Sequence, residues 1–241
     1  HGGSDSAALE RMLARLTHRG PDDHGSLQLG GAWLGHRRLS IVDLASGAQP
    51  LVSERGGLAL VGNGEIYNHE ELRSMFPAEH FTTESDNEVA LHLIDLAGPR
   101  ALAALNGMFA FVAAGEDGRF VAARDPVGIK PLYWARQNGV VRFASEMHVF
   151  DPDWQPFVEP FPPGCAWTPE DGLVRFASAV PEAAEAPALE MQVSGTRDVL
   201  IDAVRRQLMG DVPVGVFLSG GLDSSLVAAI AARVLEEQGE Q

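Results

Sequence analysis

The sequence predicts a protein of the α+β class, and three observations lead to that prediction. Stretches with apolar residues at helical spacing alternate with short β-prone runs that end in glycine or asparagine. Over 109–144, β-prone runs follow one another with turn residues between them, as in an antiparallel meander. Near the C-terminal end, the apolar run 214–218 lies between two helical stretches, which is typical of the start of a separate α/β domain.

The first element is predicted as an amphipathic helix, because apolar residues over 9–16 repeat at helical spacing. Ser4 or Asp5 can cap its start, and Gly20 with the proline that follows ends it. The next elements are read in the same way. We expect strands over 27–42 and 58–67, helices over 69–75 and 87–96, and meander strands at 109–113, 120–123, 132–135 and 140–144.

Residues 151–190 differ in composition from what precedes them. Prolines recur through this stretch, and alanine and glutamate fill the gaps between 177 and 190. Such a composition favours an extended strap over the preceding domain and then a linker. Beyond it, we expect helices over 196–208 and 224–237 on either side of a buried strand at 214–218.

Charge and cysteine content exclude several classes of partner and site. The chain has 18 basic and 33 acidic residues, a formal net charge of −15 at pH 7, without long runs of like charge. We therefore expect no nucleic acid and no membrane surface as partner. Cys165 is the only cysteine, so an intrachain disulfide is excluded and a cytoplasmic location is expected.

One short motif predicts a phosphate site. The heptad 219–225 reads Ser-Gly-Gly-Leu-Asp-Ser-Ser and lies between the apolar run that ends at Leu218 and a helix. Its glycines allow an anion to approach the backbone, and the helix N-terminus and the serines offer hydrogen-bond donors. The alternative is an ordinary strand-to-helix turn in which Asp223 is the N-cap.

A second constellation is spread over the first half of the chain, and with it the resemblance to a family becomes plain. Its segments resemble, in order, the glutaminase domain of the glutamine-hydrolysing asparagine synthetase family, and the heptad resembles the pyrophosphate loop of that family's synthetase domain. The segments are 18–22, 35–43, 63–68, 85–86, 105–111, 123–125 and 128–133.

The resemblance implies a fold and a division into domains. The fold is that of the N-terminal nucleophile hydrolases, a four-layer αββα sandwich, followed by the beginning of an α/β adenine-nucleotide hydrolase-like domain. Residues 1–150 would form the glutaminase domain, 151–195 the strap and linker, and 196–241 the incomplete start of the ATP-binding synthetase domain. The implied activity is that of a carbon–nitrogen ligase with glutamine as nitrogen donor.

The resemblance also assigns roles to individual residues. Arg38 would bind the α-carboxylate of glutamine, Glu65 and Asp86 its ammonium group, and Asn63 with Gly64 the oxyanion. These residue types suit the implied roles, because a guanidinium binds a carboxylate through two hydrogen bonds and carboxylates pair with an ammonium group. Taken singly, the residues have plainer interpretations: Asn63-Gly64 as a hairpin turn and Arg38 as a surface ion pair.

In the synthetase part, the implied substrates are ATP and aspartate. ATP or pyrophosphate would bind Leu218, Ser219, Gly220, Gly221, Asp223, Ser224 and Ser225. Asp223 would contact Mg²⁺. We expect ATP and Mg²⁺ in the full-length enzyme and no cofactor in the glutaminase domain, and we leave a homodimer open.

The cysteine nucleophile of this family is not among the 241 residues, since the sequence begins at His1 and Cys165 lies far along the chain. The retained glutamine-reading residues favour a cysteine that precedes this sequence on a first strand. Two alternatives stay open. One is an amidotransferase with another carboxylate acceptor, such as a peptide, an antibiotic precursor or a glycan. The other is a silent homologue that binds glutamine without hydrolysing it.

Overall fold

The computed structural model describes residues 5–40, 43, 46–53, 57–180, 188–210 and 214–239, and the chain divides into two compact units, His1–Val180 and Pro181–Gln241. In the first unit the main helices are α1 (Ser6–Arg15), α2 (His69–Arg73) and α3 (Glu88–Ala97). Its strands are β1 (Asp23–Leu29), β2 (Ala32–Arg38), β3 (Leu51–Val52), β4 (Leu58–Ile66), β5 (Gly107–Gly115), β6 (Phe120–Arg124), β7 (Tyr133–Gln137), β8 (Val140–Ala144), β9 (Glu159–Pro160), β10 (Cys165–Thr168) and β11 (Gly172–Arg175).

These strands form three antiparallel sheets. The largest has six strands in the order β11-β10-β6-β5-β4-β3. Strands β1 and β2 form a two-stranded sheet, and β8, β7 and β9 form a three-stranded one. Short 3-10 helices connect several elements, at Thr17–Arg19, Ala78–His80, Pro99–Ala104, Met147–Val149 and Gln155–Phe157.

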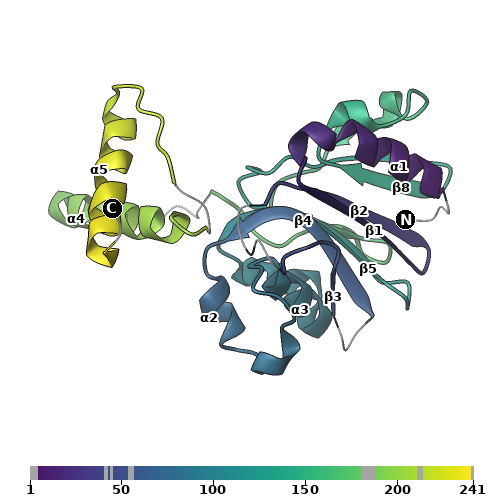
Figure 1. Cartoon of the computed structure of the whole chain (residues 1–241), viewed down its shortest axis with the longest axis horizontal. Helices are drawn as coiled ribbons and strands as arrows, with labels where there is room; N and C mark the ends of the chain where they lie inside the picture. The colour runs from purple at the N-terminus through teal and green to yellow at the C-terminus, as the bar shows by residue number, and fades with distance from the viewer. Residues whose placement is uncertain are drawn as a thin grey trace. The chain divides into compact units, whose positions relative to one another are not determined.

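Alternation along the central strands produces the layers. On β4, Leu58 and Leu60 pack on one face with α3, whereas Ala59 and Val61 pack on the other face against β2, β7 and β8. Both faces of the six-stranded sheet are therefore covered. Helix α1 closes the far side through Met12, which packs with residues of β7 and β8. The four layers, helices–sheet–sheets–helix, confirm the predicted αββα sandwich (Figure 1).

The first helix begins where the sequence predicts. The Asp5 carboxylate accepts a hydrogen bond from the Ala8 backbone N–H at 3.0 Å, so Asp5 is the N-cap, and Ser4 lies outside the described residues. Further along, the predicted strand 27–42 is two strands, β1 and β2, joined by a tight turn, and its residues 41–42 also lie outside the described part.

The expected single meander is wrong, because β5 and β6 belong to one sheet and β7 and β8 to another. Asp125 explains the division. Its side chain is fully buried, and its carboxylate accepts hydrogen bonds from the backbone N–H groups of Val127, Gly128, Ile129 and Lys130 at 2.6–3.1 Å. This turn leads the chain out of the six-stranded sheet before β7 begins.

The proline-rich stretch carries more regular structure than a strap needs. Strand β10 pairs with β6 and with β11, so it extends the six-stranded sheet, and β9 pairs with β7. The aromatic side chain of Trp167, in β10, is buried in the core between the sheets. Residues up to Val180 therefore lie in the first unit.

The second unit contains helices α4 (Leu189–Gln207) and α5 (Leu222–Gln238). The strand expected at 214–218 is wrong: these residues form no strand, and Val216 and Phe217 are exposed. A strand needs a neighbour to bond its backbone groups, and among the described residues of this unit there is none. In the part of the chain that the structure describes, every helix is too short or too polar to cross a membrane.

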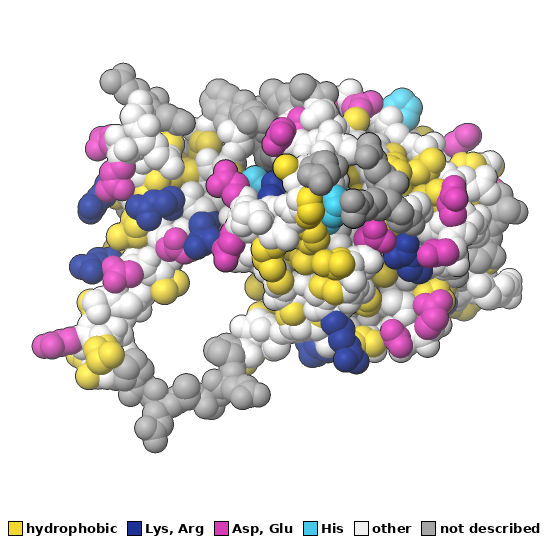
Figure 2. Space-filling view, turned by 90° about the horizontal axis from the view of Figure 1, so that it is seen from below, with side chains coloured by type: hydrophobic (Ala, Val, Ile, Leu, Met, Phe, Trp, Pro, Cys, Tyr) yellow, Lys and Arg dark blue, Asp and Glu magenta, His cyan; other side chains and the backbone are white. Residues whose placement is uncertain are grey.

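Figure 2 shows the molecule from the side of α2 and α3. Acidic and basic side chains are interspersed over this face, with apolar side chains between them. No large patch of one charge stands out on the face seen there.

Candidate functional site

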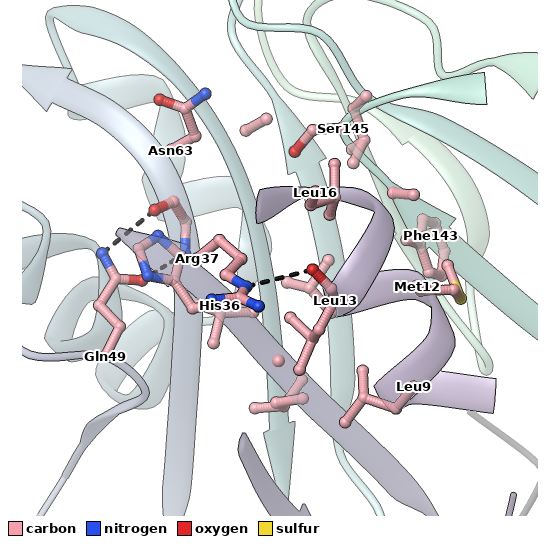
Figure 3. Close-up of a pocket in the computed structure, with 18 of the residues that line it drawn as sticks. Leu9, Met12, Leu13, Leu16, His36, Arg37, Gln49, Asn63, Phe143 and Ser145 are labelled. Carbon is pink, nitrogen blue, oxygen red and sulfur yellow. Dashed lines mark hydrogen bonds between the residues drawn. The ribbon is translucent and has the colours of Figure 1, made fainter. Parts of the chain in front are cut away.

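A cavity of about 500 Å³ opens between α1, β2, β4 and β8 in the first unit. Leu9 and Leu13 of α1 and Leu16, which directly follows the helix, line one side, and Asn63 of β4 lies at the other (Figure 3). The residues that the sequence assigned to glutamine all line this one cavity: Arg38, Asn63, Gly64, Glu65 and Asp86. Three segments far apart in the chain supply them.

Arg38 is the last residue of β2, and it is buried, with 9% of its surface exposed. Its guanidinium donates a hydrogen bond to the backbone oxygen of Asp43. Gly47 packs closely on the same group, because a Cβ at this position would lie 2.8 Å from Arg38 Nη2. Arg38 is thus held inside the cavity rather than on the surface.

Asn63, Gly64 and Glu65 lie within the ladder of β4 and β5, opposite Ala110, Phe109 and Met108. The hairpin-turn interpretation of Asn63-Gly64 is therefore wrong. Gly64 is required by packing, since a Cβ there would lie 2.8 Å from the Phe109 Cβ and 2.9 Å from the Met108 oxygen. Gly64 also lines the cavity.

Asp86 lies just before α3 and is almost fully buried, with 1% of its surface exposed. Its carboxylate accepts hydrogen bonds from the Ile66 N–H at 2.6 Å and from Asn87 Nδ2 at 3.0 Å. The pKa of Asp86 is raised to about 6, mainly by burial and also by the nearby Glu65 carboxylate, while the hydrogen bonds from the backbone oppose the rise.

His36 contributes no positive charge to the cavity near neutral pH. The pKa of His36 is about 4, because burial lowers it, and so does the neighbouring Arg38, while a hydrogen bond with the Gly62 backbone opposes this. The imidazole beside Arg38 is therefore neutral near pH 7.

The sequence interpretation missed two residues that hold the site together. The side chain of Gln49 accepts from the Gly62 N–H at 2.7 Å and donates to the Gly62 oxygen at 3.1 Å, next to Asn63 (Figure 3). Asn87 donates through Nδ2 to the Gly64 oxygen at 3.2 Å as well as to Asp86. The available signal was weak: Asn87 directly follows the motif at 85–86, whereas Gln49 lies outside every predicted motif.

The heptad lies in the second unit. Gly220 has a φ of +79°, a conformation that glycine adopts readily, and the hydroxyl oxygens of Ser219 and Ser224 lie 2.9 Å apart at the start of α5. The N-cap is Gly221, so Asp223 belongs to the first turn and the N-cap interpretation of Asp223 is wrong. Leu218, Asp223 and Ser225 are exposed, and Asp223, Ser224 and Ser225 lie in the first turn of α5.

Among the described residues, no three or more His, Cys, Asp or Glu side chains gather in a group that could hold a metal ion. Asp223 is a single carboxylate beside serine hydroxyls.

Two family models match the chain, one over its first part and one over its last part. The model described as "Glutamine amidotransferase domain" matches residues 2–159, and the model described as "Asparagine synthase" matches residues 195–239.

Similar sequences carry one recurrent name. The chain is 44% identical over 249 residues to asparagine synthetase (glutamine-hydrolyzing) of Asparagus officinalis, covering 97% of this chain and 41% of that protein. It is 43% identical over 244 residues to the protein of the same name from Sandersonia aurantiaca, covering 98% and 46%. The chain thus spans less than half the length of these relatives.

Two solved structures share the fold. Glutamine phosphoribosylpyrophosphate amidotransferase from B. subtilis, in complex with ADP and GMP, matches with a TM-score of 0.60 and 22% identity over 96% of this chain and 63% of that one. A structure described as the allosteric regulatory enzyme of purine biosynthesis matches with a TM-score of 0.61 and 21% identity over 93% and 60%. At such identities the likeness concerns the fold alone.

Proposed function

This chain belongs to the glutamine amidotransferase domain family, and from that premise we propose that its cavity binds glutamine and that its carboxamide is hydrolysed there to ammonia and glutamate. One observation carries the proposal: Arg38 and Asp86, a buried cation and a buried carboxyl group, line the same cavity. An α-amino acid presents the complementary pair, a carboxylate and an ammonium, on one carbon.

The remaining polar groups suit the carboxamide end. The side chain of Asn63 and the N–H of Gly64 would stabilise the oxyanion that forms when the carbonyl carbon is attacked. Glu65 would assist Asp86 at the ammonium group. Gln49 and Asn87 support these roles, since they hold the backbone at Gly62 and Gly64.

The nucleophile would be an N-terminal cysteine, which is not among the 241 residues. Its thiolate would attack the carboxamide carbon and form a thioester, while the leaving nitrogen takes a proton from the cysteine's own α-ammonium and departs as ammonia. Water would then add to the thioester carbon, releasing glutamate and restoring the thiol.

For the whole protein we propose ATP-dependent synthesis of asparagine, in which ATP activates the β-carboxylate of aspartate and ammonia captures it. The names of the similar proteins and the match to the asparagine synthase model support this proposal. The heptad fits a phosphate group, because a Cβ at Gly220 would meet no atom within 4 Å and serine hydroxyls flank the helix start. Asp223 would supply one carboxylate to a Mg²⁺ ion held mainly by phosphate oxygens.

For the organisation of the chain we propose a glutaminase domain over 1–150, a strap and linker over 151–195 whose strands β9, β10 and β11 complete the sheets of that domain, and the start of the synthetase domain over 196–241. A cytoplasmic location is also part of this proposal, supported by the reducing environment that a lone cysteine suits.

Calorimetric titration of the chain with L-glutamine tests the binding proposal. Arg38→Gln should weaken binding by about 30-fold or more, because it leaves the substrate carboxylate without its buried cation. Arg100→Gln is the matched control, since Arg100 is exposed and lies outside the cavity, and it should bind like the unchanged chain.

The proposal is contradicted if the unchanged chain does not bind glutamine or if Arg38→Gln binds it equally well. A second experiment measures glutamate release by a protein that carries an N-terminal cysteine ahead of this sequence. Release of glutamate shows hydrolysis, whereas glutamine binding without release shows binding alone.

A further inference from the structure

Asp43 lies between the two ends of the proposed amino-acid site. Its side chain is buried, with 7% of its surface exposed, and its backbone oxygen accepts a hydrogen bond from the Arg38 guanidinium. Its carboxylate accepts from the backbone N–H of Glu84 at 2.9 Å, two residues before Asp86. One residue therefore contacts both the cation and the segment that carries the buried carboxyl group.

Ser46, three residues along the chain, also holds the Asp43 carboxylate in place. Oδ1 of Asp43 accepts from the Ser46 N–H at 2.8 Å, and Oδ2 accepts from the Ser46 hydroxyl at 2.6 Å. Asp43 has a φ of +50°, in the left-handed region that costs most side chains free energy and that Asp and Asn tolerate best. Several hydrogen bonds thus hold one residue in an unfavourable backbone conformation beside the cavity.

The segment 83–85, which precedes Asp86, is also held by hydrogen bonds. Thr83 donates through its hydroxyl to the buried Glu88 carboxylate at 2.6 Å, and Ser85 N–H donates to the Thr83 hydroxyl oxygen at 3.1 Å. The hydrogen bond from Glu84 to Asp43 consequently ends on a segment with little freedom to shift, directly before Asp86.

We propose that Asp43 is a positioning residue that fixes the separation between Arg38 and Asp86 to match the carboxylate and ammonium groups of glutamine. This inference rests on the proposed function. Asp43 does not touch the substrate in this account; it acts through the two residues that do.

Asp43→Asn isolates this role. Asparagine tolerates the same backbone conformation, but its amide has a single acceptor oxygen, so it cannot accept all three of the hydrogen bonds that the two carboxylate oxygens accept from Ser46 and Glu84. The hydrogen bond between the Arg38 side chain and the backbone oxygen of residue 43 needs no carboxylate. The variant therefore weakens the anchoring of residue 43 between Ser46 and Glu84 and leaves the charges of Arg38 and Asp86 in place.

The test compares three ligands by titration: L-glutamine, 4-carbamoylbutanoate, which lacks the ammonium group, and 4-aminobutanamide, which lacks the carboxylate. Asp43→Asn should weaken glutamine binding by about tenfold or more and change each one-ended ligand by less than about threefold, since only glutamine needs both ends at once. Asp22→Asn is the matched control, because the Asp22 carboxylate also accepts one backbone hydrogen bond beside β2, from Ser40 at 2.9 Å.

A double-mutant cycle gives a second measurement. In the Arg38→Gln background, Asp43→Asn should cost glutamine binding much less than in the unchanged chain, because the second anchor is already lost. Equal glutamine affinity in Asp43→Asn and the unchanged chain overturns the inference, and so does equal weakening of all three ligands. If the unchanged chain binds no glutamine, the proposed function itself fails, which is a distinguishable result.

Discussion

Asp86 gives glutamine binding a pH dependence of known sign. Its pKa of about 6 lies above the value of an exposed aspartate, so below pH 6 the cavity holds a neutral carboxyl group. Binding an ammonium then requires release of a proton. We expect the dissociation constant for glutamine to be level above about pH 7 and to rise about tenfold for each pH unit below 6.

Calorimetry at a series of pH values, in buffers of different ionisation enthalpy, measures both the affinity and the proton released. Asp86→Asn should bind weakly and without this dependence. A level affinity between pH 5 and 7 in the unchanged chain would remove Asp86 from the ammonium site.

At the residue scale, the resemblance carried by short motifs pointed to five of the residues that line the cavity, but not to the contacts that arrange them. Gln49 reaches Gly62 and Asp43 reaches Glu84 across distant parts of the chain. Such pairings depend on how the strands assemble, and no local pattern encodes them. The same reason explains why Asn63-Gly64, a dipeptide typical of hairpins, lies inside a ladder instead.

At the scale of elements, α1 is held in place by a cluster of ions at its outer face. The buried carboxylate of Asp151 accepts hydrogen bonds from Arg11 at 2.8 Å, and from Arg15 and Arg142 at 3.2 Å. The Arg11 guanidinium, through its hydrogen bonds, lowers the pKa of Asp151 to about 2, and Arg142 and Arg15 contribute. This contact joins α1, a wall of the cavity, to the segment after β8.

Asp151→Asn should therefore destabilise the first unit by about 2–3 kcal/mol, because three guanidinium groups lose their shared counter-charge. Urea unfolding at pH 7 measures the change. Asp117→Asn is the control: the Asp117 carboxylate is half exposed in its pair with Arg119, and the substitution should cost less than about 1 kcal/mol. Similar losses in both variants would contradict a structural role for the cluster.

Elements were predictable where one residue type decides the local structure. The Asp5 cap and the apolar run of β4, which glycine and asparagine interrupt, belong to that class. The separation of β6 from β7 was not predictable from alternation, since it depends on the buried Asp125 and its backbone partners. The apolar run 214–218 reads as a strand, yet hydrogen-bonding neighbours, not hydrophobicity, decide whether one forms.

At the scale of the whole molecule, the first unit has all its layers within His1–Val180. A chain that ends at Val180 should then fold cooperatively and bind glutamine with the affinity of the full 241 residues. Circular dichroism during thermal unfolding and calorimetry with glutamine measure both properties. Loss of folding or of binding in the shorter chain would mean that residues after 180 belong to the glutaminase domain.

The four-layer architecture was predicted from the resemblance to a family, not from the periodicity of apolar residues. Alternation predicts strands, but it does not say which of them share a sheet. The order of the motifs along the chain supplied that information, and the packing of β4 between two cores agrees with it.

The central claim is that glutamine binds in the cavity between α1, β2, β4 and β8. Backbone amide resonances of the ¹⁵N-labelled chain, recorded as L-glutamine is added, test it most directly. We predict shifts at Arg38, at 63–65 and at 85–87, and none in α5. The first unit has another cavity, of about 450 Å³, between Arg73 and Phe81. Shifts confined to that cavity, or no shifts at all, would contradict glutamine binding at the proposed site.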